Sequence, residues 1–247
     1  MALWTWFHRL ASPPFCFRVA KTLQPWFWVP ALVLLGYGLF TGLFIAPKDY
    51  QQGDAYRIIY IHAPSAWLSL LAYSTMAIAS AIAIIWRIKL GHALAAALAP
   101  IGASFTVLCL VTGSLWGRPM WGAYWAWDAR LTSELILLFL YAGYMALRAA
   151  FDERERADRT SAILAMVGLI NVPVIHYSVI WWNSLHQGST VIRAAGPAMP
   201  SSMLVPLLAC FVGFTLLLAY FACIRLRAEI LVRERAASWL TQLMETT

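Results

Sequence analysis

Long runs of apolar residues, separated by short polar segments, make up most of the chain. A helix needs roughly 20 apolar residues to cross about 30 Å of hydrocarbon. Six runs meet or approach that length, and the fourth is interrupted only by Glu134. The pattern predicts an all-α integral membrane protein, a single bundle of six transmembrane helices with no separate soluble domain. We expect the spans near residues 26–46, 64–86, 93–115, 131–148, 161–181 and 203–224.

The composition agrees with a chain whose surroundings are mostly lipid. Hydrophobic residues make up 62% of the chain and charged residues only 12%, and the mean hydropathy is +0.69. A soluble domain usually carries about 25% charged residues. The composition therefore excludes a water-soluble globular protein.

Lysine and arginine are distributed unevenly among the segments that connect the spans. Of the 18 basic residues, 13 fall in the two ends of the chain and in the connections at 87–91 and 148–160. The other three connections, at 47–63, 116–130 and 182–202, hold five. The positive-inside rule then predicts that both termini are cytoplasmic. Topology thus explains the formal charge of +7 without a nucleic-acid partner.

The second outer connection, which we predict as an external loop over residues 116–130, is crowded with aromatic residues. Its large rings are Trp116, Trp121, Tyr124, Trp125 and Trp127. Gly117, Pro119 and Gly122 argue against one continuous helix, and Asp128 stands where the N-cap of the next helix is expected. Interfacial tryptophans could form an aromatic belt. The alternative is a rigid apolar platform for a large planar ligand, with indole N–H donors at its edge.

Two histidines lie on the same predicted face as this loop and flank it in sequence. His62 begins the second span and His186 follows the fifth. Each could be an interfacial hydrogen-bonding residue, but two imidazoles beside an apolar wall suit a six-coordinate iron porphyrin. A closed zinc site would want four ligands. His176, inside the fifth span, is a competing ligand or an interhelical hydrogen-bonding residue, and Glu134 is expected to face the bundle or a ligand cavity.

Heme carries two propionates, so cations are expected beside such a site. Arg57 and Arg130 border the predicted pocket, and a guanidinium matches a carboxylate through paired donors. Both could equally be ordinary charges that flank a membrane span.

Four motifs together resemble a known family. They are HAPSAW at 62–67, WGRPMW at 116–121, WAWDARLTS at 125–133 and WNSLHQG at 182–188. The combination is similar to the heme exporter protein C (CcmC) family of cytochrome c maturation, with its WWD domain. The resemblance implies that His62 and His186 are axial ligands to heme iron and that the tryptophans of the loop and Asp128 form the platform. Tyr124 stands where the family often has another tryptophan.

The resemblance also implies a cellular role and partners. Such a protein is not an enzyme. It binds heme b non-covalently at the periplasmic face of the bacterial inner membrane and passes it to the heme chaperone CcmE. It works with the ABC transporter subunits CcmA and CcmB and with the small membrane subunit CcmD. The chain has neither a CxxCH motif for covalent heme attachment nor a P-loop, so we expect a partner to hydrolyse ATP.

Two other functions remain open from the residues alone. A b-type cytochrome that moves electrons across the bilayer would want ligand pairs at two depths, and only His176 is deep. A heme permease could use Glu134 and His176 to line a path, although no series of basic residues marks one.

Overall fold

The computed structural model describes residues 11–182, 184–188, 190–191, 193–194 and 196–245, and these residues are helical for most of their length. Six segments are long and apolar enough to cross a membrane. This confirms the predicted all-α, six-span architecture. The elements are α2 (Pro13–Phe40), η1 (Thr41–Ile45), η2 (Asp54–Ile58), α3 (Ile59–Ile85), α4 (Lys89–Trp121), α5 (Ala129–Ala150), α6 (Arg154–Gly168), α7 (Asn171–Trp181), α8 (Ser201–Arg233) and α9 (Ser238–Glu245).

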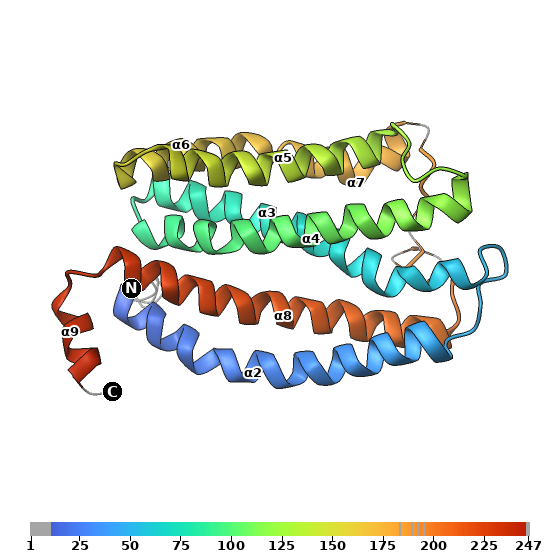
Figure 1. Cartoon of the computed structure of the whole chain (residues 1–247), viewed down its shortest axis with the longest axis horizontal. Helices are drawn as coiled ribbons and strands as arrows, with labels where there is room; N and C mark the ends of the chain where they lie inside the picture. The colour runs from blue at the N-terminus through green and yellow to red at the C-terminus, as the bar shows by residue number, and fades with distance from the viewer. Residues whose placement is uncertain (1–10, 183, 189, 192, 195, 246–247) are drawn as a thin grey trace.

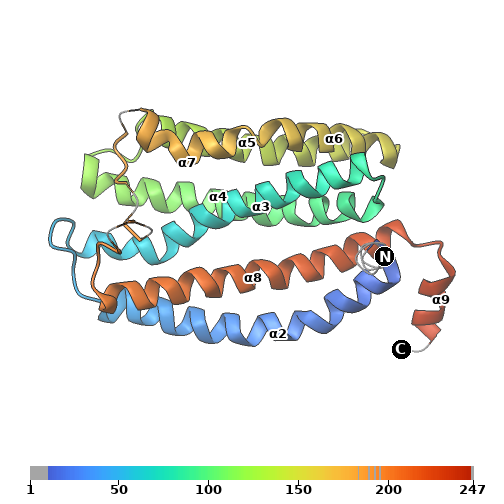
Figure 2. The ribbon, with the colours of Figure 1, turned by 180° about the vertical axis from the view of Figure 1, so that it is seen from behind.

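The long helices run side by side in three layers (Figures 1 and 2). Helix α2 packs along α8, α3 packs along α4, and α5 packs along both α6 and α7, with α3 and α4 in the middle layer. The connections at 46–58, 122–128 and 182–200 gather at one end of the bundle, and α9 lies at the other end with the start of α2. The three predicted outer connections therefore share one end.

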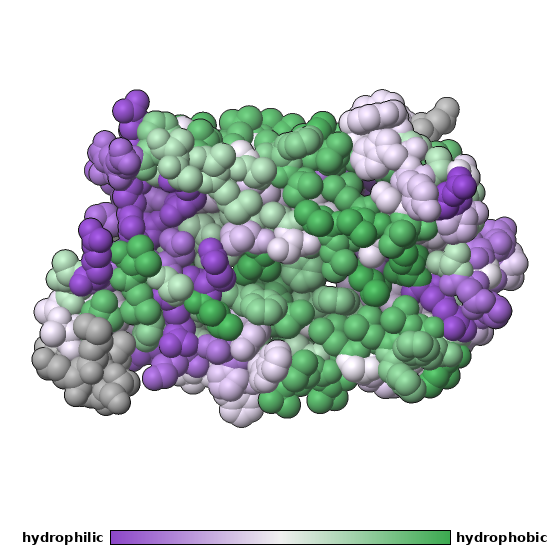
Figure 3. Space-filling view, in the orientation of Figure 1, coloured by the Kyte–Doolittle hydropathy of each residue, from purple (hydrophilic) through white to green (hydrophobic). Residues whose placement is uncertain are grey.

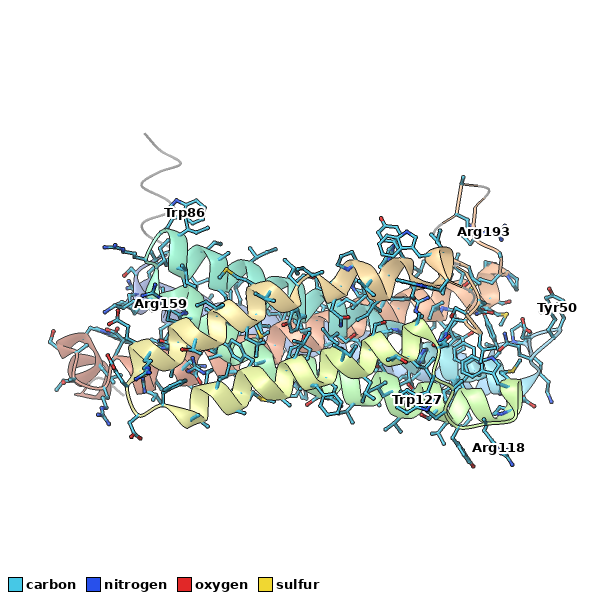
Figure 4. The ribbon with its side chains drawn as sticks, turned by 90° about the horizontal axis from the view of Figure 1, so that it is seen from above. Tyr50, Trp86, Arg118, Trp127, Arg159 and Arg193 are labelled. Carbon is cyan, nitrogen blue, oxygen red and sulfur yellow. The ribbon has the colours of Figure 1, made fainter. Side chains whose placement is uncertain are left out.

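The surface carries the banding expected of a bundle that crosses a bilayer. Hydrophobic residues cover the middle of the molecule, and hydrophilic residues gather at both ends (Figure 3). Figure 4 shows Arg118 and Arg193 at the end that carries the outer connections and Arg159 at the opposite end. The helix axes therefore lie across the expected membrane.

Small residues let the helices approach closely, as expected where lipid removes the hydrophobic drive for helix association. A Cβ atom at Gly102 of α4 would lie 2.1 Å from the Tyr141 hydroxyl of α5. Gly42, in the π-helical turn η1, lies equally close to the Tyr60 ring of α3, because its Cβ would be 2.5 Å from that ring. These two glycines hold α5 and the end of α2 against the middle layer.

The fifth span is a broken helix, where the sequence suggested one continuous span over 161–181. α6 ends at Gly168 and α7 begins at Asn171. Pro173 explains the break, because it lacks an N–H and its ring would collide with the carbonyl of Leu169 in a continuous helix. The Asn171 side chain donates a hydrogen bond to the Ser133 carbonyl of α5 (2.9 Å), which fixes α7 against α5.

A buried ion-pair network joins three helices at the end opposite the outer connections. Asp158 of α6 is 6% exposed, and its carboxylate accepts hydrogen bonds from both terminal nitrogens of Arg233 of α8, at 2.7 and 2.8 Å. It also pairs with Arg148 of α5, which lies 3.5 Å from Glu229 of α8. The network ties the α5–α6 pair to α8.

Replacing Asp158 by Asn should lower the free energy of unfolding by roughly 3 kcal/mol, because Arg148 and Arg233 lose their close carboxylate and keep only the more distant Glu229. SDS titration of the detergent-solubilised protein measures this quantity. Asp152→Asn, at an exposed residue just before α6, is the matched control and should leave the free energy of unfolding unchanged. Equal unfolding curves for both variants would contradict a stabilising role for the network.

Candidate functional site

The His62 imidazole is held in one tautomer by the neighbouring helix α4. Its Nδ1 atom lies 3.1 Å from the Cys109 carbonyl oxygen and 3.0 Å from the Thr112 hydroxyl oxygen. A carbonyl can only accept, and Thr112 donates its own proton to Leu108 (2.6 Å). Nδ1 must therefore carry the proton of a neutral ring, and Nε2 keeps its lone pair.

The His186 imidazole is oriented in the same way by a carboxylate. Its Nδ1 atom lies 3.3 Å from Oδ2 of Asp128, and both side chains are largely buried. Burial lowers the pKa of His186 below its usual value, although Asp128 opposes that shift. The ring is therefore neutral near pH 7, with its proton on Nδ1 and a lone pair on Nε2.

Asp128 joins the start of α5 to the segment that carries His186. One carboxylate oxygen accepts from the Leu131 amide (2.8 Å), so Asp128 is the N-cap that its position in the sequence predicted. The other accepts from the Ser184 hydroxyl (2.6 Å) and the Leu185 amide (3.2 Å). Burial alone would raise the pKa of Asp128, but these hydrogen bonds and His186 lower it below its usual value. The carboxylate is thus ionised.

Each of the two imidazoles packs against a tryptophan at the end of α4. The Trp116 ring meets His62 edge to face, with ring centroids 5.5 Å apart. Trp121 meets His186 in the same manner at 5.1 Å. Both Trp116 and Trp121 lie in the last turns of α4, so the two imidazoles pack against the same end of that helix. The structure therefore brings His62, His186, Trp116 and Trp121 together.

Helix α4 extends into the predicted loop, so the loop bounds of 116–130 were too wide. The helix continues to Trp121, and the break comes at Gly122, whose φ of +77° ends the helix in the left-handed conformation. Gly117 is accommodated because its missing side chain makes room for Trp121, whose ring would lie 2.9 Å from a Cβ there. Only residues 122–128 connect α4 to α5.

The remaining aromatic residues of the connection lie at its rim. Trp125 and Trp127 meet edge to face at 5.4 Å, and Trp127 is 78% exposed (Figure 4). Tyr124 is exposed, and the Arg118 guanidinium carbon lies over its ring, 5.6 Å from the ring centroid. The Trp125 indole N–H is buried and has no hydrogen-bond partner among the described residues. That N–H is a donor that a ligand could use.

The structure separates the two candidate arginines. Arg57 donates to the carbonyl oxygens of Leu43 (2.7 Å) and Ala46 (2.8 Å), so its guanidinium caps the end of the first span. Arg130 is half-buried in the first turn of α5, two residues after Asp128. Within the described part of the chain it has no carboxylate partner. Its position keeps Arg130 as a candidate for the site, and the structure does not bring Arg57 into it.

His176 and Glu134 also take distinct positions. His176 lies on the exposed face of α7, where its ring meets that of Tyr177 edge to face, with ring centroids 4.8 Å apart. It is thus not buried between helices, where the sequence had suggested that it could make an interhelical hydrogen bond. Glu134 is 5% exposed and accepts a hydrogen bond from Ser69 of α3 (2.7 Å). It faces the bundle, as expected.

Comparison with known proteins assigns the family. The model of the family described as heme exporter protein C (CcmC) matches residues 6–241. The chain belongs to the heme exporter protein C family. It is 46% identical to heme exporter protein C of Haemophilus influenzae over 99% of both chains. It is 48% identical to that of Escherichia coli K12 over 98% of both chains.

The family likeness extends beyond bacteria. A putative cytochrome c biosynthesis ccmC-like mitochondrial protein of Marchantia polymorpha is 43% identical over 87% of this chain and 90% of its own length. The family model, which matches residues 6–241, covers every span of the bundle. The family assignment therefore applies to the whole membrane domain and is not limited to the tryptophan motif.

Sequence reasoning missed four residues that orient the site, because a hydrogen bond to a distant histidine or tryptophan leaves no pattern in the sequence. They are Gln52, Cys109, Thr112 and Ser184. The spacing of Thr112 could have indicated its role, since it lies on α4 one helical turn before Trp116. Gln52 had no such signal, because its partners lie 64 and 135 residues away.

Proposed function

We propose that this protein binds one heme b non-covalently between His62 and His186 and passes it to the heme chaperone CcmE for c-type cytochrome maturation. Membership of the heme exporter protein C family gives the general role, heme handling in that pathway. One observation carries the ligand assignment. Each Nδ1 is engaged in a hydrogen bond, so each Nε2 can offer a lone pair to iron.

The surrounding residues fit the rest of a heme. Trp116 and Trp121 supply apolar walls, and Trp125 and Trp127 with Asp128 complete the platform. The buried, unpartnered Trp125 N–H and the Arg130 guanidinium supply donors for propionate oxygens. Heme itself supplies the iron and the vinyl groups that a cytochrome needs. The chain's residues hold it in a shallow site, which permits release.

We expect Arg130→Gln to weaken heme binding about tenfold, because a charge-assisted hydrogen bond contributes roughly 1.5–3 kcal/mol. Titration of the detergent-solubilised protein with hemin measures the affinity. Arg118→Gln removes an exposed arginine of the same face and should leave the affinity unchanged. With heme dimethyl ester, which lacks propionate charge, Arg130→Gln should have no effect. An equal loss with the ester would contradict the propionate contact.

We also propose the sidedness of the protein. Both termini are cytoplasmic, residues 1–247 form one membrane domain in the bacterial inner membrane, and the site faces the periplasm. The excess of Lys and Arg in the connections at one end supports this orientation. We further propose CcmA, CcmB and CcmD as partners, with ATP hydrolysed by an ABC transporter subunit and no reaction catalysed by this chain.

The delivery step is tested with two purified proteins. Protein loaded with heme, mixed with apo-CcmE in detergent, should lose its heme absorption as CcmE gains heme. The double variant His62→Ala/His186→Ala should transfer none. Retention of all heme by the wild-type protein under these conditions, or equal transfer by the variant, would count against the proposal.

The electron-transfer alternative is less well supported. It needs a second pair of ligands at another depth, and the one deep histidine, His176, is exposed on the outer side of α7. A permease role would need a polar path across the bundle. Glu134 and Ser69 form a buried polar pair, but they lie beneath His62 and engage each other.

A further inference from the structure

The side-chain amide of Gln52 connects the two halves of the proposed heme site. Its oxygen accepts a hydrogen bond from the Trp116 indole N–H (2.8 Å). Its nitrogen donates to the Gln187 side-chain oxygen (3.1 Å). Trp116 packs against His62, and Gln187 follows His186 in sequence. One side chain therefore links the Trp116 ring, which packs against His62, to the segment that carries His186.

The backbone around Gln52 is held in a fixed turn. The Asp49 carboxylate accepts from the amides of Gln51 (2.9 Å) and Gln52 (2.8 Å). Asp49 and Gly53 also form a two-hydrogen-bond bridge, and Gly53 has a φ of +59°, which favours glycine. Because the turn is rigid, the Gln52 amide has a defined position before it meets its two partners.

The segment that carries His186 is thus held from two directions. Asp128, at the start of α5, binds Ser184, Leu185 and His186. Gln52 binds Gln187 from the side of α3 and α4. We propose that Gln52 is a positioning residue that fixes His186 relative to His62 and so controls how long heme is retained. This inference rests on the proposed function, and Gln52 itself need not touch heme.

The two hydrogen bonds can be broken separately. Gln52→Ala removes both. Gln187→Ala removes the bond to the His186 segment and leaves that to Trp116, and Trp116→Phe keeps the ring against His62 but removes the indole N–H. Loss of one neutral hydrogen bond should speed heme dissociation roughly fivefold, and loss of both more than tenfold. The double variant Gln52→Glu/Gln187→Lys keeps an acceptor for Trp116 and replaces the second hydrogen bond by an ion pair, so it should retain slow dissociation.

The experiment measures heme transfer from each detergent-solubilised variant to apomyoglobin, together with the ferric absorption spectrum. Gln52→Ala should release heme more than about tenfold faster and show a larger high-spin fraction, because His186 is less well placed. Gln51→Ala, at the exposed neighbouring residue, is the matched control and should behave as the wild type. An unchanged rate and spectrum in Gln52→Ala, or the same change in Gln51→Ala, would overturn the inference.

A second measurement needs no heme. Hydrogen–deuterium exchange of the amides of residues 184–188 should increase in heme-free Gln52→Ala and not in Gln51→Ala. If the wild-type protein binds no heme yet exchange still rises, the proposed function fails and the positioning of this segment by Gln52 stands. If exchange is unchanged, the positioning role is wrong whether or not the protein binds heme.

Discussion

Replacing His62 by Ala should weaken heme binding more than about 100-fold, and so should replacing His186. Loss of a residue that merely orients a metal ligand already costs roughly 10–100-fold, so loss of the ligand itself should cost more. Each Nε2 offers a lone pair because its Nδ1 is engaged, and the site holds no other histidine among the described residues. Hemin titration of the detergent-solubilised variants measures the affinity.

Two controls separate ligation from folding. External imidazole can enter the space left by a missing side chain, so it should restore a six-coordinate spectrum in either single variant. His176→Ala, at the exposed position on α7, should bind heme as the wild type does. Full affinity in either His62→Ala or His186→Ala would contradict the ligand pair, as would loss of heme in His176→Ala.

Replacement of Asp128 by Asn should lower heme affinity roughly 10–100-fold while the protein stays folded. Asparagine is as good an N-cap as aspartate, so the start of α5 should persist. Its amide nitrogen cannot accept from His186 and Ser184, and the carboxylate that fixes the imidazole is lost. Affinity from hemin titration and unfolding by SDS together report the two effects.

Asp128→Ala provides the comparison for this prediction. It removes the helix N-cap as well as the hydrogen bonds to Ser184 and His186, so it should reduce the free energy of unfolding by about a further 0.5–2 kcal/mol. Heme affinity should fall to about the same level in both variants. If Asp128→Asn binds heme like the wild type and only Asp128→Ala loses affinity, Asp128 acts through the helix cap alone.

The six spans could be predicted from the sequence because long apolar runs are the strongest signal a chain offers. The end of α4 could not be predicted, because Gly117 and Pro119 normally indicate a break. Here the Trp121 ring occupies the space above Gly117, and the helix continues until Gly122 adopts a positive φ. A side-chain contact between successive turns of the same helix offset the helix-breaking tendency of Gly117 and Pro119.

The charged and polar residues of the site were harder to predict. Arg57 and Arg130 both border the predicted pocket in the sequence, which offers no way to choose between them. Only the direction of the side chain shows that Arg57 caps the first span. His176 had a signal that could have been used. Asn171, Ile175 and Ser178 recur at helical spacing and face the bundle, which places His176 outside.

The contacts that connect distant segments were beyond the reach of sequence patterns. The N-cap role of Asp128 is local and was expected, but its hydrogen bond to His186 joins residues 58 positions apart. Gln52 lies in a turn with no motif, and it has a role only because the fold brings Trp116 and Gln187 to it. Such residues become visible only once the helices are packed.

The central claim is that imidazoles from α3 and from the segment after α7 bind one heme between them. Low-temperature magnetic circular dichroism of the ferric heme complex tests it most directly, because the near-infrared charge-transfer band identifies the axial ligand pair. The wild-type protein should show low-spin heme with two imidazole ligands, and His62→Ala and His186→Ala should each lose that band. A wild-type spectrum without bis-imidazole ligation, or one that survives both substitutions, would contradict the account.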